Sequence, residues 1–156
     1  MSTLFEKNEN DFKRVNVSAV EMVKSIKKGE ITSEELVKSY IEQIKKKEKD
    51  IGAWEFFDQE LALAQAKKLD VLHQSGKHGD LHGIPVGIKD IFDTADMPTT
   101  DGTEIHKKNL SWNDCTVVSK LKQAGAIIMG KTVTTELAYY SPGKTKCREI
   151  YPLEGL

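Results

Sequence analysis

The sequence is poor in cysteine and proline, and it has no long apolar run. Of its 156 residues, two are cysteine and four are proline. Cys115 and Cys147 are too few for a disulfide framework and are not spaced as in a metal knuckle, so we expect buried or incidental thiols. The longest apolar run, at 124–129, is much shorter than the roughly 20 residues that cross a bilayer. These absences exclude a disulfide-rich secreted domain and argue against a membrane-spanning chain.

An excess of charge of one sign is also absent. The 23 basic residues nearly balance the 24 acidic ones, and the net charge is −1. A nucleic-acid-binding surface needs a clustered excess of Lys and Arg, so we expect no direct nucleic-acid partner. The basic run 45–47 is followed by Glu48 and Asp50, which is typical of the polar side of a helix. The first ten residues are polar and acidic, unlike a secretory signal, and they predict a cytoplasmic protein.

The first eighty residues predict three helices. Ser18 and Glu21 form a capping box before a short helix that ends at Gly29. A second capping box, Thr32 with Glu35, opens a longer helix that we expect to reach about residue 47. After a predicted loop, Asp58 can cap a third helix, whose end is marked by glycines at 76 and 79.

From residue 81 the apolar residues change to the period of a strand. Ile84, Val86 and Ile88 alternate with smaller or polar residues, which predicts a strand that ends at Asp90. After a polar loop, Asp114 is expected to cap a helix that runs toward Gly125, and the segment 126–129 then predicts a second buried strand. A strand, a crossover helix and a second strand form a parallel unit, so the fold class is α/β with a helical lead-in. Two strands cannot form a stable sheet alone, so we expect an incomplete sheet with an exposed edge.

The segment 125–132 matches the G-x-x-x-x-G-K-[ST] pattern of a phosphate-binding loop. In such a loop a strand precedes the first glycine, and the next residues turn so that their amides converge on phosphate. Here a helix is predicted before Gly125, and Ala-Ile-Ile-Met is typical of a strand. We therefore interpret the segment as a helix end followed by a core strand, and nucleotide binding remains the alternative.

The sequence indicates no metal or cofactor site. His73, His78, His82 and His106 form no tight metal pattern, because the pair spaced by four residues falls in a glycine-containing loop rather than on a helix. Three aspartates at 90, 93 and 96 lack the glycine and terminal glutamate of a calcium loop. We interpret these residues as loop histidines and as ordinary caps and turns.

Lys89 is the candidate catalytic residue. It ends an otherwise apolar strand, and Gly87 and Pro85 on its own face of that strand leave space beside it. A lysine in a desolvated pocket loses its charge readily and can act as a general base. The alternative is structural, with the amine paired to a carboxylate such as Asp90 or extended into water.

Several blocks of the chain together resemble the N-terminal part of the amidase signature family. The similarity covers roughly residues 15–146, in the family's order and spacing. The blocks are LHGIPVGIKD at 81–90, PTT at 98–100, DCTVV at 114–118, LKQAGAIIMGKT at 121–132, ELA at 136–138 and, in the helical lead-in, GEITSEEL at 29–36. The resemblance implies a tail at 1–14, the N-terminal part of an amidase domain at 15–146 and a divergent tail at 147–156.

The resemblance implies a mechanism for Lys89. Family members hydrolyse amide C–N bonds with a serine nucleophile, a second serine in a cis peptide and a lysine, and Lys89 matches that lysine. The neutral amine would accept a proton through the bridging serine and later return it to the leaving nitrogen. This requires an apolar pocket in which no carboxylate pairs with the amine.

The two serines of that mechanism belong to a Gly/Ser-rich segment that has no counterpart here, since the sequence contains no Ser-Ser or Gly-Gly pair. We therefore expect a truncated amidase-signature hydrolase that is inactive alone, with a small-molecule amide as the substrate of the intact protein. Truncation, a gene-end artefact or a frameshift would each give such a chain. One alternative is the amidase subunit of a glutamine-dependent aminoacyl-tRNA amidotransferase. Another is a non-catalytic interaction remnant that associates through its sheet edge.

Overall fold

The computed structural model describes residues 17–139. The tails predicted at 1–14 and 147–156, and Cys147, lie outside the described residues. Within 17–139 the elements are three helices, three strands in one sheet, a further helix and two short 3-10 turns, η1 (Glu104–His106) and η2 (Glu136–Ala138).

The first two helices begin as the sequence predicts. Helix α2 (Ala19–Lys27) follows a complete Ser18–Glu21 capping box, and Gly29 follows its end with a φ of 72°. Helix α3 (Ser33–Ile51) follows the Thr32–Glu35 box. It extends past residue 47 to a left-handed Gly52, so the prediction of its end was four residues short. In each box the N-cap side chain accepts a hydrogen bond from the backbone N–H of the glutamate, and the glutamate side chain accepts one from the N-cap backbone N–H. Because both bonds join residues three positions apart, the sequence predicts where these helices begin.

Helix α4 (Gln59–Gln74) confirms the third predicted helix. The Asp58 carboxylate accepts hydrogen bonds from the backbone N–H groups of Glu60 and Leu61 at 2.9 and 3.0 Å. The Gln65 side chain reaches the central strand, where its amide nitrogen donates to Ile128 O at 3.0 Å and its oxygen accepts from Ile128 N at 3.1 Å. A side-chain amide thus replaces a neighbouring strand at that point of the sheet.

The sheet has three strands in the order β1–β3–β2. Strands β2 (Pro85–Lys89) and β3 (Ile127–Thr132) are parallel, which confirms the predicted unit. Strand β1 (Trp54–Phe57) pairs with β3 in the antiparallel direction, and the sequence analysis missed it. Its only signal is a group of three aromatic residues around Glu55, which is too short to show a period. The additional antiparallel strand makes the sheet mixed.

Helix α5 (Thr116–Gln123) crosses from β2 to β3, but the prediction of its cap was wrong. Cys115 is the N-cap and makes no side-chain cap hydrogen bond. The Asp114 carboxylate instead accepts from Ala95 N at 2.9 Å and pairs with Lys122 Nζ at 2.9 Å. Its partners are thus a loop amide 19 residues earlier in the chain and a lysine 8 residues later.

The phosphate-loop alternative does not fit the local fold. A helix precedes Gly125, and residues 127–132 form the central strand, buried from Ile127 to Lys131. The intervening amides belong to a strand instead of a turn, so they do not converge on an anion.

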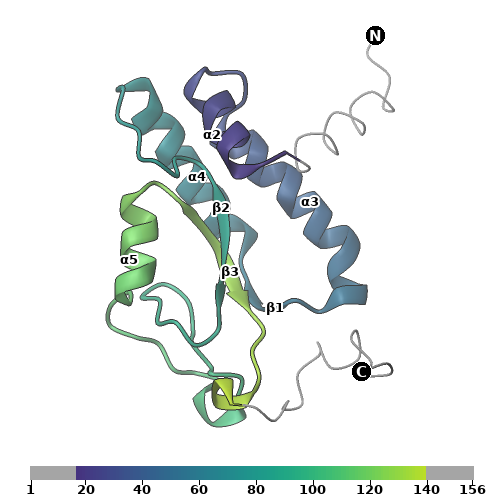
Figure 1. Ribbon diagram of the computed structural model, residues 1–156. Helices are drawn as coiled ribbons and strands as arrows, with labels where there is room; N and C mark the ends of the chain where they lie inside the picture. Colours follow the sequence, from purple (N-terminus) through teal and green to yellow (C-terminus); the bar gives the residue numbers. More distant parts are fainter. Residues whose placement is uncertain (1–16, 140–156) are drawn as a thin grey trace.

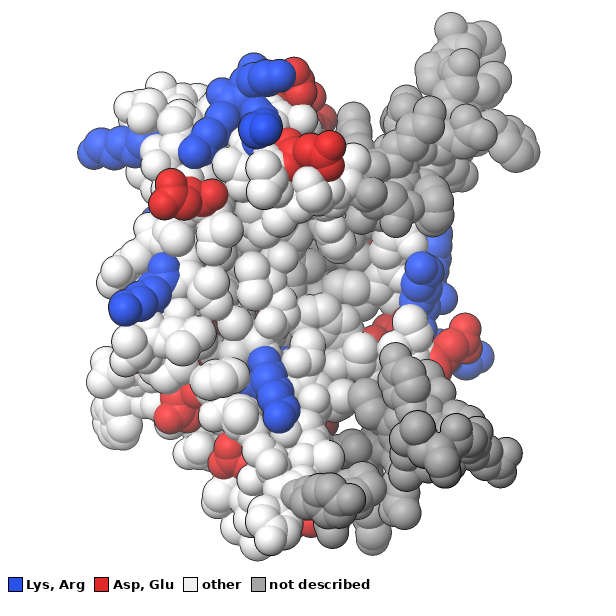
Figure 2. Space-filling model, in the orientation of Figure 1, with Lys and Arg blue, Asp and Glu red and all other residues white. Residues whose placement is uncertain are grey.

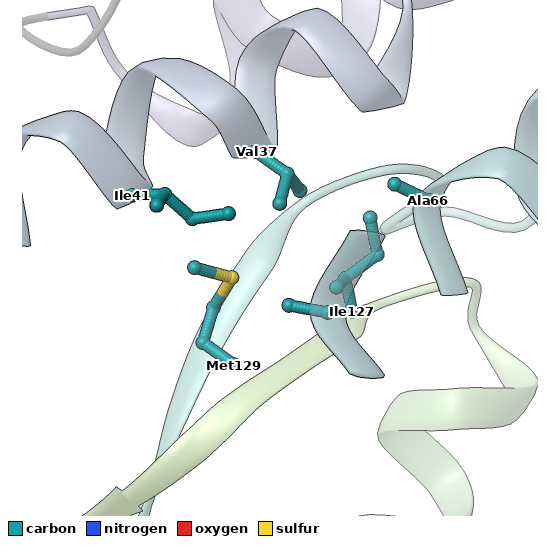
Figure 3. Packing of buried hydrophobic residues seen from close by; sticks show 6 residues of the cluster. Val37, Ile41, Ala66, Ile127 and Met129 are labelled. Atoms are coloured by element: carbon teal, nitrogen blue, oxygen red, sulfur yellow. The ribbon is translucent and has the colours of Figure 1, made fainter. Parts of the chain in front are cut away.

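Helices cover both sides of the sheet (Figure 1). Val37 and Ile41 of α3 and Ala66 of α4 pack against Ile127 and Met129 of β3, as Figure 3 shows. On the opposite side, Val118 of α5 and the buried Met97 pack on Ile88 and Ile128. A third cluster, separate from these two, joins α2 and α3 to the start of β2. Alternate residues of β3 thus enter different cores, as expected for a strand covered on both faces.

An extra residue in β3 changes which side chains face which core. Val86 pairs with Ile128, but Gly87 pairs with Gly130, so Met129 is not matched in β2. Strict alternation from Ile127 and Met129 would place Lys131 on the α3 side. The bulge moves Lys131 to the α5 side, where it meets Asp90.

The surface carries charges of both signs. Figure 2 shows basic and acidic side chains in small mixed groups around a broad uncharged area on the visible face. Among residues 17–139, no helix is both long and apolar enough to span a membrane.

Candidate active site

Lys89 is the last residue of β2, at the carboxyl end of the strand, and its register partner is Thr132. Within residues 17–139, β2 pairs with β3 on one side only, so Lys89 lies on an edge strand. Its side chain is exposed. The expectation of an apolar pocket around this amine is therefore not met by the described part of the chain, where no other element covers it.

The space beside Lys89 is shaped by a glycine. Gly87 shares the face of β2 with Lys89, and a Cβ added there would lie 2.9 Å from Thr132 Cγ2 and 3.2 Å from Trp54 Cη2. Any larger residue would collide with these two side chains. Trp54 and Thr132 therefore pack closely on the backbone of Gly87, two residues before Lys89 on the same face of β2.

Asp90 is not the partner of Lys89. Its side chain is fully buried on the opposite face, where both carboxylate oxygens accept from Thr100 N at 3.1 and 3.2 Å and one also accepts from the Thr100 hydroxyl. Its backbone N–H donates to Thr132 O at 2.9 Å. Within the described residues, Lys89 makes no ion pair. The structural alternative that pairs Lys89 with Asp90 is thus wrong.

Lys131 is the cation that pairs with Asp90. Its side chain is fully buried, and its Nζ lies 3.4 Å from Asp90 Oδ1. It also donates to Thr99 Oγ1 at 2.6 Å and to Pro98 O at 3.3 Å. Burial lowers the pKa of Lys131, and the negative charge of Asp90 opposes this shift.

Sequence reasoning missed this buried network. Lys131 stood in the segment that matches a phosphate-loop pattern, and Thr99 stood in a block recognised only by resemblance. A lysine two residues after an apolar run was the available signal. The bulge that places Lys131 on the α5 side of the sheet cannot be predicted from the sequence of β3, because it depends on how β3 pairs with β2.

Three of the four histidines lie together, contrary to the interpretation of them as separate loop residues. His73 is in the last turn of α4, His78 follows in the loop, and His82 stands shortly before β2. Each offers one ring nitrogen, and these three atoms lie within 4.8 Å of one another. Burial, followed by repulsion from His78 and His73, lowers the pKa of His82. His106 is elsewhere, 2.9 Å from the Asp101 carboxylate.

A shallow pocket of about 280 Å³ lies between α4 and α5 and is not lined by Lys89. Its lining residues are Gln65, Lys68, Leu69, Leu72, Asp96, Lys122 and Ala126. It is therefore not a candidate for the substrate site next to the predicted base.

Comparison with known proteins agrees with the resemblance. The Amidase family model matches residues 35–149. A glutamyl-tRNA(Gln) amidotransferase subunit from Nitrosococcus oceani is 37% identical over 128 residues, covering 82% of this chain and 26% of that protein.

Solved structures show the same fold. An amidase family protein from Bacillus anthracis superposes with a TM-score of 0.76 at 30% identity, over 86% of this chain and 27% of that one. The peptide amidase of Stenotrophomonas maltophilia gives a TM-score of 0.76 at 26% identity, over 83% and 27%.

The chain therefore belongs to the amidase family, and its described part has the mixed α/β architecture of amidase-signature enzymes. It spans about a quarter of the length of the curated relatives that it matches.

Proposed function

We propose that this chain supplies the lysine base of an amidase-signature hydrolase, the enzyme class that cleaves carboxylic amide C–N bonds. The residue is Lys89, acting with two serines that are supplied by a part of the protein beyond the matched quarter. The observation that carries the proposal is the division of charges at the end of β2: the adjacent acid, Asp90, is paired with Lys131, and Lys89 is left without an ion-pair partner among residues 17–139.

The arrangement suits a base that must give up its proton. An ammonium paired with a carboxylate keeps its proton, whereas an unpaired amine next to apolar atoms is easier to neutralise once water is removed. Trp54 packs on the backbone of Gly87, which shares the face of β2 with Lys89. In the intact enzyme, the part that covers the open side of β2 would complete the dry pocket and bring the serine hydroxyls.

The reaction proposed is acyl transfer. Neutral Lys89 takes a proton through a bridging serine hydroxyl as the nucleophilic serine attacks the amide carbonyl, and it then protonates the leaving nitrogen. Water hydrolyses the acyl-enzyme. Neither the nucleophile nor an oxyanion-stabilising group is identified in this chain, so we propose that the chain alone is inactive on amides.

A chimera tests the role of Lys89. The matching quarter of the Bacillus anthracis amidase family protein is replaced by residues 17–139 of this chain, and hydrolysis of a simple aryl amide is measured. Lys89→Met in the chimera should lower kcat by about 10²–10⁴-fold, the usual contribution of a general acid–base group. Lys77→Met, a change at another exposed lysine, is the control. A folded chimera that is inactive, or one that keeps its activity after Lys89→Met, contradicts the proposal.

A second candidate is the amidase subunit of a glutamine-dependent aminoacyl-tRNA amidotransferase, favoured by the 37% identity to a subunit of such an enzyme. Protein partners would then receive the ammonia released from glutamine. The corresponding chimera with the Nitrosococcus oceani protein distinguishes the two. Lys89-dependent amidation of glutamyl-tRNA favours the amidotransferase, and activity confined to simple amides favours the hydrolase.

A third candidate is a non-catalytic interaction remnant. The outer edge of β2 has no partner strand within residues 17–139, and Ile105 and Trp112 are 88% and 96% exposed nearby in sequence. An open edge and exposed apolar side chains favour association with another chain. Sedimentation of the purified 156-residue chain tests this: a stable complex or oligomer that survives Lys89→Met, with no amide hydrolysis, favours the remnant.

A further inference from the structure

A cluster of three histidines lies at the opposite end of β2 from Lys89. His82 lies three residues before the first residue of the strand and Lys89 ends it, so the whole strand, about 13 Å long, lies between them. His73 comes from the last turn of α4 and His78 from the connecting loop. We define these three residues as the histidine cluster. It is independent of the amide chemistry proposed above.

The ring nitrogens of the histidine cluster are spaced like metal ligands. Nδ1 of His73 and Nδ1 of His78 lie 3.2 Å apart and share a hydrogen bond, which a bound ion would replace. Two nitrogens bound tetrahedrally to Zn²⁺ at 2.0–2.1 Å lie about 3.3 Å apart. The third nitrogen is within 4.8 Å of both, and the exposed side chain of His78 leaves room for it to close the remaining gap.

His82 provides the second observation that points to a ligand. Its side chain is 1% exposed, and its Nε2 is buried with no hydrogen-bond partner. A buried ring nitrogen without a partner costs free energy unless something binds it. Its other ring nitrogen is left to hydrogen-bond the backbone of Leu69, an arrangement that fixes the tautomer of metal-bound histidines.

The loop that carries the cluster is held in place by the neighbouring backbone. Leu81 N donates to Ala124 O and Gly83 N to Gly125 O, both at 2.9 Å. Gly79 packs directly on the Ala124 carbonyl, where a Cβ would collide. These contacts fix His82 before any ligand binds, so a metal ion would have little ordering cost to overcome.

An acid that interacts with the cluster adds negative charge without competing for the ion. The carboxylate of Asp70 interacts electrostatically with His82. Both its oxygens are already bound, accepting from Ser33 N at 2.7 Å and from Glu34 N at 3.0 Å. It thus contributes negative charge near the cluster as a neighbour of the ligands.

We propose that His73, His78 and His82 bind a divalent transition-metal ion of the zinc class, with the fourth position open to water. Three neutral imidazoles are a ligand set that suits Zn²⁺ and is unsuited to Mg²⁺ or Ca²⁺, which prefer oxygen. The bound ion links the end of α4 to the start of β2. We assign it this linking role and no step of amide hydrolysis.

Zinc titration of the tag-free 156-residue chain tests the site. Cys115→Ser and Cys147→Ser are introduced first, so that thiolates do not bind the metal. Calorimetry should give one Zn²⁺ per chain in the micromolar range or tighter, and saturating Zn²⁺ should raise the melting temperature while Mg²⁺ does not. No binding up to millimolar Zn²⁺ would overturn the proposal.

His78→Gln is the decisive variant because His78 is exposed and its loss does not disturb a core. It should weaken Zn²⁺ binding at least tenfold, since even loss of a residue that supports a ligand commonly costs 10–100-fold. His73→Gln should do the same. His106→Gln, at the histidine outside the cluster, should leave binding unchanged. Equal affinity in His78→Gln and the parent chain, or an equal loss in His106→Gln, would also refute the site.

Discussion

Two lysines near the carboxyl ends of neighbouring strands of this sheet have opposite surroundings. Lys131 of β3 is fully buried, with Asp90, Thr99 and Pro98 around its amine. Lys89 of β2 is exposed and makes no ion pair within residues 17–139. The buried lysine is therefore held by contacts within residues 17–139, and the exposed one, which makes no ion pair there, is the lysine that we propose as the base.

Of the variants that test this difference between the two lysines, Lys131→Met should have the largest effect on the free energy of unfolding. The variant leaves the Asp90 carboxylate buried without its cation, which should lower the free energy of unfolding by about 3–5 kcal/mol. Urea denaturation followed by circular dichroism measures it. Asp90→Asn combined with Lys131→Met should cost less than the sum of the single changes, because the two side chains interact directly. Additive costs would show that the pair is not coupled.

Gly130→Ala tests the close approach of β1 to β3 at the residue that follows the unmatched Met129. A Cβ at this position would collide with the backbone oxygen of Phe56 in β1 and would lie 3.0 Å from Trp54 Cε3. Overpacking of this kind usually costs about 1–3 kcal/mol, and we expect a loss of unfolding free energy in that range. A variant as stable as the parent chain would mean that β1 does not pair with β3 as described.

Asp114→Asn tests the ion pair of Asp114 with a third lysine, Lys122, whose burial is intermediate between those of Lys131 and Lys89. Lys122 pairs with Asp114 and with Asp96, each at 2.9 Å. Burial alone would raise the pKa of Asp114, but hydrogen bonds from Ala95 N and Lys122 outweigh it and lower the pKa. The unfolded state therefore binds this proton more readily, so the stabilisation by Asp114 is present above about pH 4 and is lost as the pH falls below it.

We expect Asp114→Asn to lower the free energy of unfolding by about 1 kcal/mol at pH 7, since Lys122 keeps its second acid. The difference from the parent chain should shrink when denaturation is repeated near pH 3. Ser119→Ala, on the same helix, is the matched control. A difference that grows on acidification would contradict the sign of this shift.

Lys89→Met should have the smallest effect on stability. Its amine is exposed and unpaired in the described residues, so the change in unfolding free energy should be within about 0.5 kcal/mol. Denaturation in parallel with Lys131→Met gives the contrast directly. A loss of more than 1 kcal/mol would show that Lys89 has a structural partner and would weaken its assignment as a base.

The sequence predicted the helices of the first half better than the sheet. The capping boxes at Ser18 and Thr32 and the cap at Asp58 are local, since each joins residues two or three positions apart. Strand β1 was missed because four residues carry no readable period and its pairing with β3 depends on a segment far along the chain. Asp114 was misassigned for the same reason, because its partners are not its sequence neighbours.

The residues of the candidate sites show the same difference between what local sequence predicts and what contacts between distant segments decide. Lys89 was recognised as a candidate from its place after an apolar strand and from the resemblance, and its role as a base stays a prediction. The partner of Asp90 and the meeting of three histidines were not predicted. The histidines meet because the chain turns at Gly76, which has a φ of 72° after α4, and the partner of Asp90 depends on the unmatched Met129 in β3.

Local sequence alone was enough to establish which segments are helices, that β2 and β3 form a parallel unit through α5, and which family the chain resembles. Hydrogen bonds between near neighbours and the spacing of apolar residues carry that information. The burial of Lys131, the exposure of Lys89 and the histidine cluster came from packing between distant segments. A single extra residue in a strand reverses the face of every side chain after it, and that depends on pairing with another strand.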